Sequence, residues 1–333
     1  MTILFMPCTL NGCALWRFYM PHLKIPGSHF AFNPKGPMPT DRIAESDVCV
    51  VQRLGTLSNL EAIKKMKAMG KKVIYDLDDN LWDIPRHNSS YKFYQEMKEM
   101  FDTCMNECHA LVVSTQALRA RVVKNLKPRI PVYVIENAID FDLFYPLPSE
   151  KREEVIVGWS GSKTHAKDLA DVFKLIPGIL ADNKRMRFEI VGEDVPDELL
   201  NNPQVRTRRP IPIAEYPSRV ASWRWDLFLA PLEDTSFTRS KSNIKMLEAG
   251  ALHRPILVSP VGSYKSFCSL RDDLGFLMCK TKKQWIDKIT MFVNHPDERT
   301  HYGNLLYEVS KERYEVQLSA SRWITLAEDI LCR

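Results

Sequence analysis

The chain has 333 residues, of which 45% are hydrophobic and 26% charged, and its formal net charge is +5. This composition excludes a disordered or fibrous chain, and the length exceeds what one hydrophobic core organises, so we expect two domains. The positive charge is too small to establish a polyanionic partner such as nucleic acid or an acidic membrane surface.

The sequence predicts a protein without a secretory leader or an integral membrane segment. No basic leader precedes the apolar run at the start, and no later stretch has the ~18 uninterrupted apolar residues that a spanning helix needs. Eight scattered cysteines lack disulfide-domain spacing, which predicts reduced thiols and a cytoplasmic location. Cys104, Cys108 and His109 could share a helix face, but without a second ligand pair the sequence favours buried side chains over a zinc site.

Short β-rich runs alternate with helical stretches in the first half of the chain, the pattern of a parallel sheet covered on both faces. Apolar residues at three- and four-residue intervals predict helices over residues 57–69, 91–105 and 116–126. A Pro-rich stretch at 26–39 is predicted to be a surface excursion, because proline cannot donate to a ladder or continue a helix. The expected strands are Ile3–Met6, Val48–Leu54, Lys72–Asp76, Ala110–Ser114 and Val132–Glu136.

A polar, proline-stiffened segment at residues 146–154 predicts a domain boundary near residue 150. The alternation then restarts, which implies a second sheet of the same kind. Ligands of open parallel sheets bind outside the carboxyl ends of the strands, so two such sheets facing each other would form a cleft. The strands expected here are Val155–Trp159, Met186–Val191, Trp225–Ala230, Pro255–Ser259 and Gly275–Cys279.

The first strand of the second half runs into a loop of small and basic residues before a helix that begins near Ala166. Small residues let the backbone approach a ligand closely, and a helix N-terminus beside Lys163 and Lys167 favours a phosphate. The loop lacks the Walker spacing and the three glycines of a dinucleotide fingerprint. A solvated strand-to-helix turn is therefore the alternative.

The segment from Phe237 to Leu252 is more specific. A serine near its start is expected to cap a helix whose first amides attract a diphosphate, and two lysines supply positive charge beside it. Glu248 lies two turns in, where its carboxylate would accept hydrogen bonds from both hydroxyls of a ribose. The alternative is an amphipathic helix with solvated lysines. The predicted donor-binding residues of this segment are Ser240, Lys241, Ser242, Asn243, Ile244, Lys245 and Glu248.

This segment resembles the donor-binding helix of retaining GT-B glycosyltransferases, whose pattern is a Glu, seven residues, a second Glu, and a small-residue run before Gly-x-Pro-Val. Glu248 matches the second Glu, and residues 253–256 match the run into the strand. Position 240, where the first Glu would stand, is serine, and Glu233 or Asp234 in the preceding loop is the candidate substitute. The serine and lysines of this segment are instead similar to those of a subgroup of these enzymes that is common in bacteria and their phages.

Further segments resemble the same family in the same order along the chain. Residues 157–165 resemble the first strand and loop of the family's C-terminal domain, where basic residues meet the diphosphate. Residues 136–140 are similar to the Pro-Asn-Gly-Ile-Asp that closes its N-terminal domain, and residues 73–82 to an aspartate-rich strand end. The donor-binding residues that the resemblance implies in the first loop are Gly161, Ser162, Lys163, His165 and Lys167.

The resemblance implies an α/β protein of the GT-B fold, with two doubly wound Rossmann-like domains facing a central cleft. Residues 1–150, joined by the C-terminal helix 312–333, would form the acceptor-side domain, and residues 151–311 the nucleotide-sugar-binding domain. It further implies a retaining transfer from a nucleotide diphosphate sugar, a UDP-sugar, with no metal and no cofactor.

Asp76, Asp78 and Asp79 follow an apolar strand, and carboxylates there sit at the mouth of a parallel sheet. We expect them to face the ligand, where one could orient the acceptor hydroxyl or stabilise an oxocarbenium-like transition state. A structural cap on the next turn, by Asp79 or Asn80, is the alternative. Asp76 and Asp78 also match the DxD spacing of metal-binding GT-A enzymes, which we discount because those enzymes lack the helix that carries Glu248.

Asn11 and Gly12 follow the first strand as the small residues of the family's acceptor-side loop do.

The sequence leaves the chemical identity of the acceptor undecided. Basic clusters, although such runs are usually solvated faces, could track a phosphate backbone, which admits glycosylation of a hydroxymethylated pyrimidine in phage DNA, in the host cytoplasm. The alternatives are a carbohydrate or lipid-linked glycan acceptor, or a non-catalytic module that binds the nucleotide without turnover. The basic clusters are Lys64-Lys65, Lys71-Lys72, Lys124–Arg129 and Arg206–Arg209.

Overall fold

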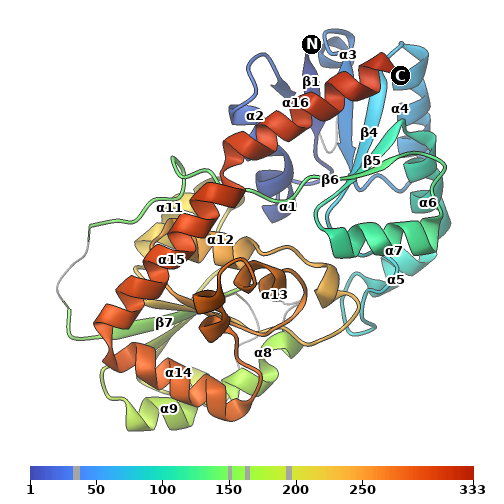
Figure 1. Ribbon diagram of the computed structural model, residues 1–333. Helices are drawn as coiled ribbons and strands as arrows, with labels where there is room; N and C mark the ends of the chain where they lie inside the picture. Colours follow the sequence, from blue (N-terminus) through green and yellow to red (C-terminus); the bar gives the residue numbers. More distant parts are fainter. Residues whose placement is uncertain (33–37, 149–151, 162–165, 193–196) are drawn as a thin grey trace. The chain divides into compact units, whose positions relative to one another are not determined.

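The computed structural model describes residues 1–32, 38–148, 152–161, 166–192 and 197–333 (Figure 1). The chain forms two compact units, each built around one parallel sheet. Unit 1 consists of Met1–Asp140, Arg239–Ser242 and Tyr314–Arg333, and unit 2 of Phe141–Thr238 and Asn243–Arg313.

The sheet of unit 1 has six parallel strands in the order β2-β1-β3-β4-β5-β6. The two strands β3 and β5 are buried along their whole length, as expected for strands that helices cover on both faces. The chain leaves β1 toward β2 and then returns to the other side of β1 at β3, so the strand order reverses at this point. The strands are β1 (Ile3–Met6), β2 (His29–Phe30), β3 (Val48–Gln52), β4 (Lys72–Leu77), β5 (Ala110–Val113) and β6 (Val132–Val134).

Two of the longer helices of unit 1, α4 and α7, begin at side-chain caps. The Thr56 hydroxyl accepts a hydrogen bond from Asn59 N, and the Asn59 side chain accepts one from Thr56 N, which starts α4 with a capping box. Thr115 caps α7 in the same way through Leu118 N. The helices are α1 (Gly12–Ala14), the π-helical η1 (Leu15–Tyr19), α2 (Met20–Leu23), α3 (Thr40–Ala44), α4 (Leu57–Ala68), α5 (Tyr91–Glu96), α6 (Lys98–Glu107), α7 (Gln116–Leu126) and α16 (Val316–Cys332).

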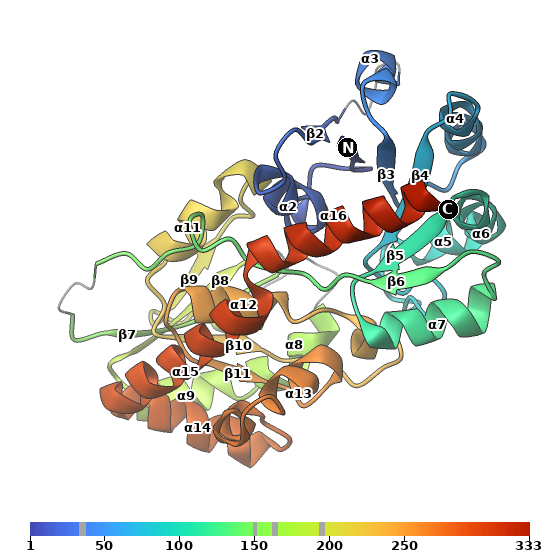
Figure 2. The same ribbon diagram turned by 45° about the horizontal axis from the view of Figure 1, so that its top comes forward.

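The C-terminal helix α16 packs into the core of unit 1, beside α2 and the sheet (Figures 1 and 2). Its Trp323 is fully buried and meets Phe5 edge to face at 5.5 Å between ring centroids. A backbone bridge between Ile139 and Glu315 joins the chain just before this helix to the end of the N-terminal segment. A helix from the end of the sequence thus completes the first core.

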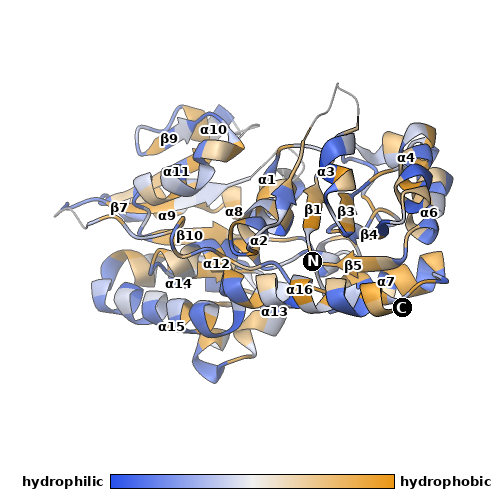
Figure 3. Ribbon diagram, turned by 90° about the horizontal axis from the view of Figure 1, so that it is seen from above, coloured by the Kyte–Doolittle hydropathy of each residue, from blue (hydrophilic) through white to orange (hydrophobic). Residues whose placement is uncertain are grey.

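The sheet of unit 2 has five parallel strands in the order β11-β10-β7-β8-β9, with β7 at its centre. All of β7 is buried, and Gly158 within it is required because a Cβ there would collide with the Trp225 indole. Figure 3 shows the strands of the protein as largely hydrophobic and most outer helix faces as hydrophilic. The strands are β7 (Val155–Ser160), β8 (Met186–Val191), β9 (Val205–Arg208), β10 (Leu227–Ala230) and β11 (Ile256–Val258).

Helices connect and cover these strands. The central element for the site is α12, which joins the loop after β10 to β11, and the longest is α15, which leads back to unit 1 along the chain. The helices are α8 (Ala166–Phe173), α9 (Ile176–Asp182), α10 (Asp197–Leu200), η3 (Ile213–Glu215), α11 (Tyr216–Ser222), η4 (Thr238–Ser240), α12 (Ile244–Ala251), α13 (Gly262–Cys268), η5 (Asp272–Leu277), α14 (Lys282–Asn294) and α15 (Pro296–Tyr314).

The predicted strands are present except for residues 275–279, where the prediction is wrong. Residues 275–277 end the 3-10 helix η5, and Met278 just after it makes a single bridge to Val258, because a short apolar run can bury its side chains in either backbone conformation. The predicted helix over 91–105 is interrupted at Met97, between α5 and α6.

Two edge strands were not predicted. β2 is only two residues long and lies inside the Pro-rich stretch, and β9 has three exposed residues out of four, so neither shows an apolar run.

Candidate functional site

The strand order of unit 2 reverses beside β7. The chain runs outward through β8 and β9 on one side and then returns to β10 and β11 on the other. Ligands of open parallel sheets bind outside the carboxyl ends of the strands at such a reversal, where the flanking loops diverge. The loops after β7 and β10 are therefore the place to look for a ligand site in this unit.

A polar network joins these loops to α12 and α11. The Lys245 ammonium donates to Ser160 Oγ at 2.9 Å, to the Tyr216 hydroxyl at 2.7 Å and to Glu248 Oε2 at 2.8 Å. The Tyr216 hydroxyl donates to Glu248 Oε1 at 3.0 Å. Ser160 is the last residue of β7, and Lys245 and Glu248 lie one turn apart on α12. The network is thus built at the carboxyl end of the central strand.

Burial and charge in this network define its protonation. Glu248 has a side chain only 1% exposed, and that of Lys245 is 25% exposed. Burial lowers the pKa of the Lys245 ammonium, but the Glu248 carboxylate and the Tyr216 phenol raise it more, so the net shift is upward. Burial, with repulsion from Glu248, raises the pKa of Tyr216 to about 12. At neutral pH the network therefore holds a cationic Lys245 and a neutral Tyr216.

The start of α12 differs from the expectation. We expected Ser240 or Ser242 to cap the helix, but its N-cap is Asn243, and no side-chain hydrogen bond caps it. Met246 N and Leu247 N donate to the carbonyl of Asn243, which closes the first turn from the backbone alone.

The two serines are instead held in unit 1. Thr115 Oγ1 donates to the Ser240 carbonyl at 2.9 Å, and Asn80 Nδ2 lies 3.4 Å from Ser240 Oγ. Asn137 Nδ2 donates to Ser242 Oγ at 2.8 Å. These bonds explain why residues 239–242 belong to unit 1 although the chain on either side belongs to unit 2.

The loop after β7 is described only in part. Gly161 donates its amide to Val191 O at 3.0 Å, and a Cβ on it would collide with the Trp159 ring. Lys167 is exposed in the first turn of α8. The predicted donor-binding residues Ser162, Lys163 and His165 lie outside the described residues.

A second charged cluster lies in unit 1, in the loops that follow β1, β3 and β4. Arg53 Nε is 3.2 Å from Asp78 Oδ1, Arg53 Nη1 is 3.7 Å from Asp79 Oδ2, and Arg53 Nη2 donates to the Cys13 sulfur. Lys241 Nζ lies 3.8 Å from Asp79 Oδ1. Arg53 has a φ of +45°, a strained backbone conformation of the kind that clusters at functional sites.

Within the described ranges, Cys13, Asp78 and Asp79 also form a group whose ligand atoms lie within 4.8 Å of one another. Thiolate and carboxylates are metal ligands, but a guanidinium already binds all three side chains here. Burial, followed by repulsion from Asp78, raises the pKa of the Cys13 thiol well above its usual range. A protonated thiol and a resident Arg53 favour an ion-pair cluster over a divalent-metal site.

Asp76 differs from the other two predicted catalytic aspartates. It lies within β4, its side chain is fully buried, and its Oδ1 is 2.6 Å from Arg17 Nη2. Gln52 Nε2 donates to its other oxygen at 3.2 Å. We expected Asp76 to face the ligand, but its carboxylate instead faces protein donors on the π-helical turn η1 and on β3. Its chemistry is therefore that of a positioning group.

The predicted acceptor-side loop has a structural role of its own. Asn11 Oδ1 accepts hydrogen bonds from Cys13 N at 3.0 Å and Ala14 N at 3.4 Å, so it caps α1. Gly12 is the first residue of that helix, and no atom lies within 4 Å of a Cβ placed on it.

Sequence reasoning missed Arg17, Arg53 and Tyr216. Arg17 carried one signal, because it is the sole charged residue in the apolar run from residue 13 to 21. Arg53 stands near the end of the expected strand Val48–Leu54 and Tyr216 follows Glu215, and nothing in the sequence distinguishes either from a solvated side chain. Their contacts arise from residues 25 to 40 positions away.

A comparison with protein families gives one match. Residues 174–325 match the family described as "Glycosyl transferase-like". The sequence has no match among curated proteins. The matched region includes α12 and therefore Lys245 and Glu248.

Solved glycosyltransferase structures share the fold over nearly the whole chain. Sucrose-phosphate synthase from Thermosynechococcus elongatus has a TM-score of 0.71 at 11% identity, covering 99% of each chain. HepE from Anabaena, solved with UDP, has a TM-score of 0.66 at 14% identity, covering 99% of this chain and 100% of its own. A glycosyltransferase from Rickettsia africae has a TM-score of 0.67 at 13% identity, covering 99% of this chain and 98% of its own.

These findings confirm the predicted α/β architecture and the GT-B fold. The family match over residues 174–325 agrees with the predicted resemblance to glycosyltransferases. Across the described ranges, no helix combines the length and the apolar character needed to cross a bilayer. The eight cysteines, all of which the structure describes, are free thiols, and Cys104, Cys108 and His109 do not form a metal-ligand group.

Proposed function

We propose that this glycosyl transferase-like protein of the GT-B fold transfers a sugar from a nucleotide diphosphate sugar to an acceptor hydroxyl. The observation that carries the proposal is the network of Lys245, Glu248 and Tyr216 at the carboxyl end of β7. It combines a cation for a diphosphate with a fixed carboxylate for hydroxyl groups, at the strand-order reversal where open parallel sheets bind ligands.

We assign the diphosphate of the donor to Lys245 and to the first turn of α12. The Lys245 ammonium is cationic at neutral pH, and a helix N-terminus attracts negative charge through its free amides. No side chain caps α12, and Met246 N and Leu247 N already donate to the Asn243 carbonyl. We therefore assign the anion to the amides of Ile244 and Lys245. These fixed positive groups supply the charge that a divalent ion would otherwise supply, which is why we propose a metal-independent reaction.

We assign the ribose of the donor to Glu248. An ionised carboxylate accepts about four hydrogen bonds, and Lys245 and Tyr216 use two of those positions. The remaining lone pairs suit two adjacent hydroxyls. Since HepE was solved with UDP and with UDP-glucose, we propose UDP as the nucleotide.

We assign the acceptor side of the reaction to Asp78 and Asp79. Arg53 holds both carboxylates, and a carboxylate fixed in this way can orient an acceptor hydroxyl or stabilise the positive charge that develops on the sugar. We propose retention of the anomeric configuration on the strength of the family resemblance. Analysis of the product anomer by NMR tests it.

For the acceptor we propose a hydroxyl group of a carbohydrate or a lipid-linked glycan, and keep a hydroxymethylated pyrimidine in DNA as the second class. In the basic cluster Arg206–Arg209, Arg208 makes two hydrogen bonds to Glu189, and Arg206 lies 3.5 Å from Glu154. Guanidinium groups already paired with acids contribute less to a phosphate contact, so this cluster favours a non-nucleic-acid acceptor.

The deciding experiment is a screen of nucleotide sugars for nucleoside diphosphate release. Each donor is incubated with the protein alone, with a glycan panel and with hydroxymethylated duplex DNA, in buffer that contains EDTA. Release that depends on an acceptor supports the proposal and identifies the acceptor class. Binding of UDP without transfer or donor hydrolysis would show a non-catalytic module, and the absence of UDP binding would refute the site itself.

A further inference from the structure

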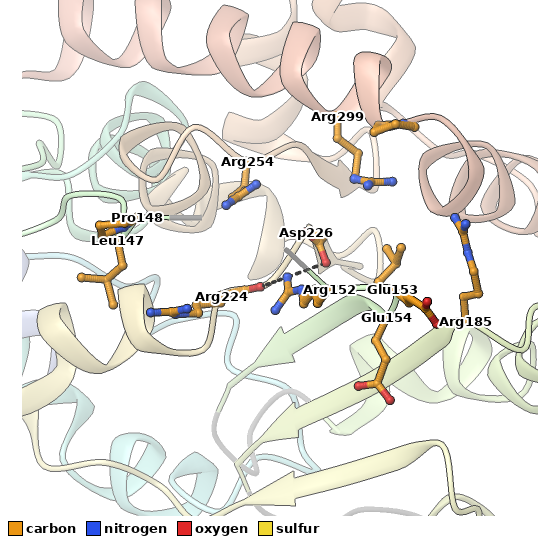
Figure 4. Close-up of a pocket in the computed structure, with 12 residues that line it drawn as sticks. Leu147, Pro148, Arg152, Glu153, Glu154, Arg185, Arg224, Asp226, Arg254 and Arg299 are labelled. Carbon is orange, nitrogen blue, oxygen red and sulfur yellow. Dashed lines mark hydrogen bonds and ion pairs between the residues drawn. The ribbon is translucent and has the colours of Figure 1, made fainter. Parts of the chain in front are cut away.

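A pocket with a volume of about 570 Å³ lies in unit 2, at the amino ends of its strands (Figure 4). Arg185 directly precedes β8, Asp226 directly precedes β10, and Arg254 stands two residues before β11. Ser160 and the Lys245 network lie at the opposite, carboxyl end of the same sheet. The pocket is therefore separate from the donor site proposed above.

Arginines dominate the wall of this pocket. They come from the chain before β7, from the starts of β8 and β11, from the end of α11 and from the first turn of α15. In Figure 4 their side chains surround Asp226. The five arginines are Arg152, Arg185, Arg224, Arg254 and Arg299.

The acids of the pocket do not balance this charge. Asp226 Oδ2 is committed to Arg152 Nη2 at 2.6 Å and to the amide of Ile156 at 2.8 Å. Glu154 pairs at 2.9 Å with Arg187, which does not line the pocket. The remaining acid, Glu153, is exposed. The pocket thus has a local excess of positive charge.

Two of the guanidinium groups are half-buried and make few hydrogen bonds with the described residues. Arg254 makes no side-chain hydrogen bond or ion pair with any described residue, and Arg299 uses its Nη1 for the carbonyls of Phe292 and Val293. Burial lowers the pKa of Arg299, Asp226 raises it, and the charges of the neighbouring arginines lower it again, so that the net shift is downward. Partly desolvated like charges repel, and a bound anion would relieve that repulsion.

The backbone beside the pocket is strained as well. Arg224 has a φ of +54°, which is uncommon for a residue other than glycine. This conformation places the Arg224 carbonyl where the Arg152 guanidinium donates to it. Strained backbone persists where the surrounding structure holds it, and it clusters at binding sites.

We propose that this pocket binds a small phosphorylated anion, at a site distinct from the donor site. Guanidinium forks match the oxygens of a phosphate in pairs, so several of them around one cavity suit a ligand with one or two phosphate groups. A volume of about 570 Å³ falls within the ordinary range for small-molecule sites. A nucleic-acid backbone would need a basic stripe along an open surface instead of a pocket.

The test is calorimetric titration with inorganic pyrophosphate. Because the donor site also attracts a diphosphate, the titration is run in a Lys245→Ala background, and Arg254→Gln is added to it. The matched control is Arg209→Gln, since Arg209 is an exposed arginine of the same unit that does not line the pocket. We expect one remaining site in the background protein, weakened roughly tenfold or more by Arg254→Gln and unchanged by Arg209→Gln.

Further titrations distinguish a small phosphorylated ligand from a nucleic-acid backbone. Orthophosphate, pyrophosphate and a hexose phosphate are compared with a short duplex oligonucleotide. Tighter binding of pyrophosphate or the hexose phosphate supports a small-ligand site, whereas an oligonucleotide that competes better than either overturns it. Equal affinities of the Arg254→Gln and Arg209→Gln proteins, or no binding in the background protein, also overturn it. If Arg254→Gln unfolds, Arg185→Gln replaces it, with the same expectations.

Discussion

Arg17 and Asp76 form a fully buried ion pair, in which Arg17 Nη2 lies 2.6 Å from Asp76 Oδ1 and the side chains are 1% and 0% exposed. Arg17 also donates to Asn137 Oδ1 and to the carbonyl of Ile135. One guanidinium thus ties the π-helical turn η1 to β4 and to the end of the N-terminal segment. Asp78 directly follows β4, and the loop that carries Asn11 leads through α1 into η1, so the pair helps to position both.

Removal of one partner of this pair should destabilise unit 1 strongly. Arg17→Met leaves the Asp76 carboxylate buried without its cation, and the expected loss in the free energy of unfolding is about 3–5 kcal/mol. Urea denaturation measures it. The control is Arg42→Met, whose pair with Glu45 is exposed, and that change should stay within about 0.5 kcal/mol. A loss for Arg17→Met as small as that of the control would show that the pair does not hold the unit together.

Glu248 should be required for nucleotide binding. At 100 times its Kd, UDP is expected to stabilise the native state by about 2.7 kcal/mol, which raises the melting temperature. Glu248→Gln should abolish this rise, because an amide cannot accept as many hydrogen bonds and leaves Lys245 without its counter-charge. Glu298→Gln, at an exposed glutamate of the same unit, should keep the rise. Normal UDP binding by the Glu248→Gln protein would refute the assignment.

The raised pKa of Tyr216 predicts that the protein loses stability at alkaline pH. Its folded pKa of about 12 exceeds the ordinary tyrosine value of 10.0 because burial and Glu248 oppose ionisation. The unfolded chain therefore releases its proton first as pH rises. The stability linked to Tyr216 is complete below pH 10.0 and is lost between pH 10.0 and about 12.

Urea denaturation between pH 9 and 12 measures this effect, with Tyr216→Phe as the comparison. Phenylalanine does not ionise, so the stability of the wild-type protein relative to this variant should fall across that interval. Parallel pH profiles of the two proteins would contradict the assignment of the raised pKa to Tyr216.

Asp78 and Asp79 should affect turnover more than donor binding. Asp79→Asn is expected to lower kcat about 100-fold or more, with little change in the Kd for UDP, because these carboxylates act on the transition state. Single-turnover kinetics and titration with UDP separate the two quantities. Asp41→Asn, at an exposed aspartate of the same unit, serves as the control. Turnover that stops in EDTA and returns with Mn²⁺ would instead indicate a metal at Cys13 and the two aspartates.

Local pattern was sufficient to predict most of the fold. Nine of the ten predicted strands are present, since a run such as Val155–Trp159 buries both faces and carries its own signal. Residues 275–279 have the same apolar character, but residues 275–277 form the end of a 3-10 helix; the prediction failed because periodicity alone cannot separate the two states in so short a run.

The site depended on the tertiary structure to a greater degree. The positions of Lys245 and Glu248 on one helix follow from their spacing, because residues three apart share a helix face. The sequence by itself therefore determined most element types and this pair. Only the folded chain decided that Tyr216 completes the pair, that Arg53 binds Asp78 and Asp79, and that Ser240 is held in unit 1. Those contacts join segments far apart in the sequence, and charge and burial at such a distance arise only once the sheets have formed.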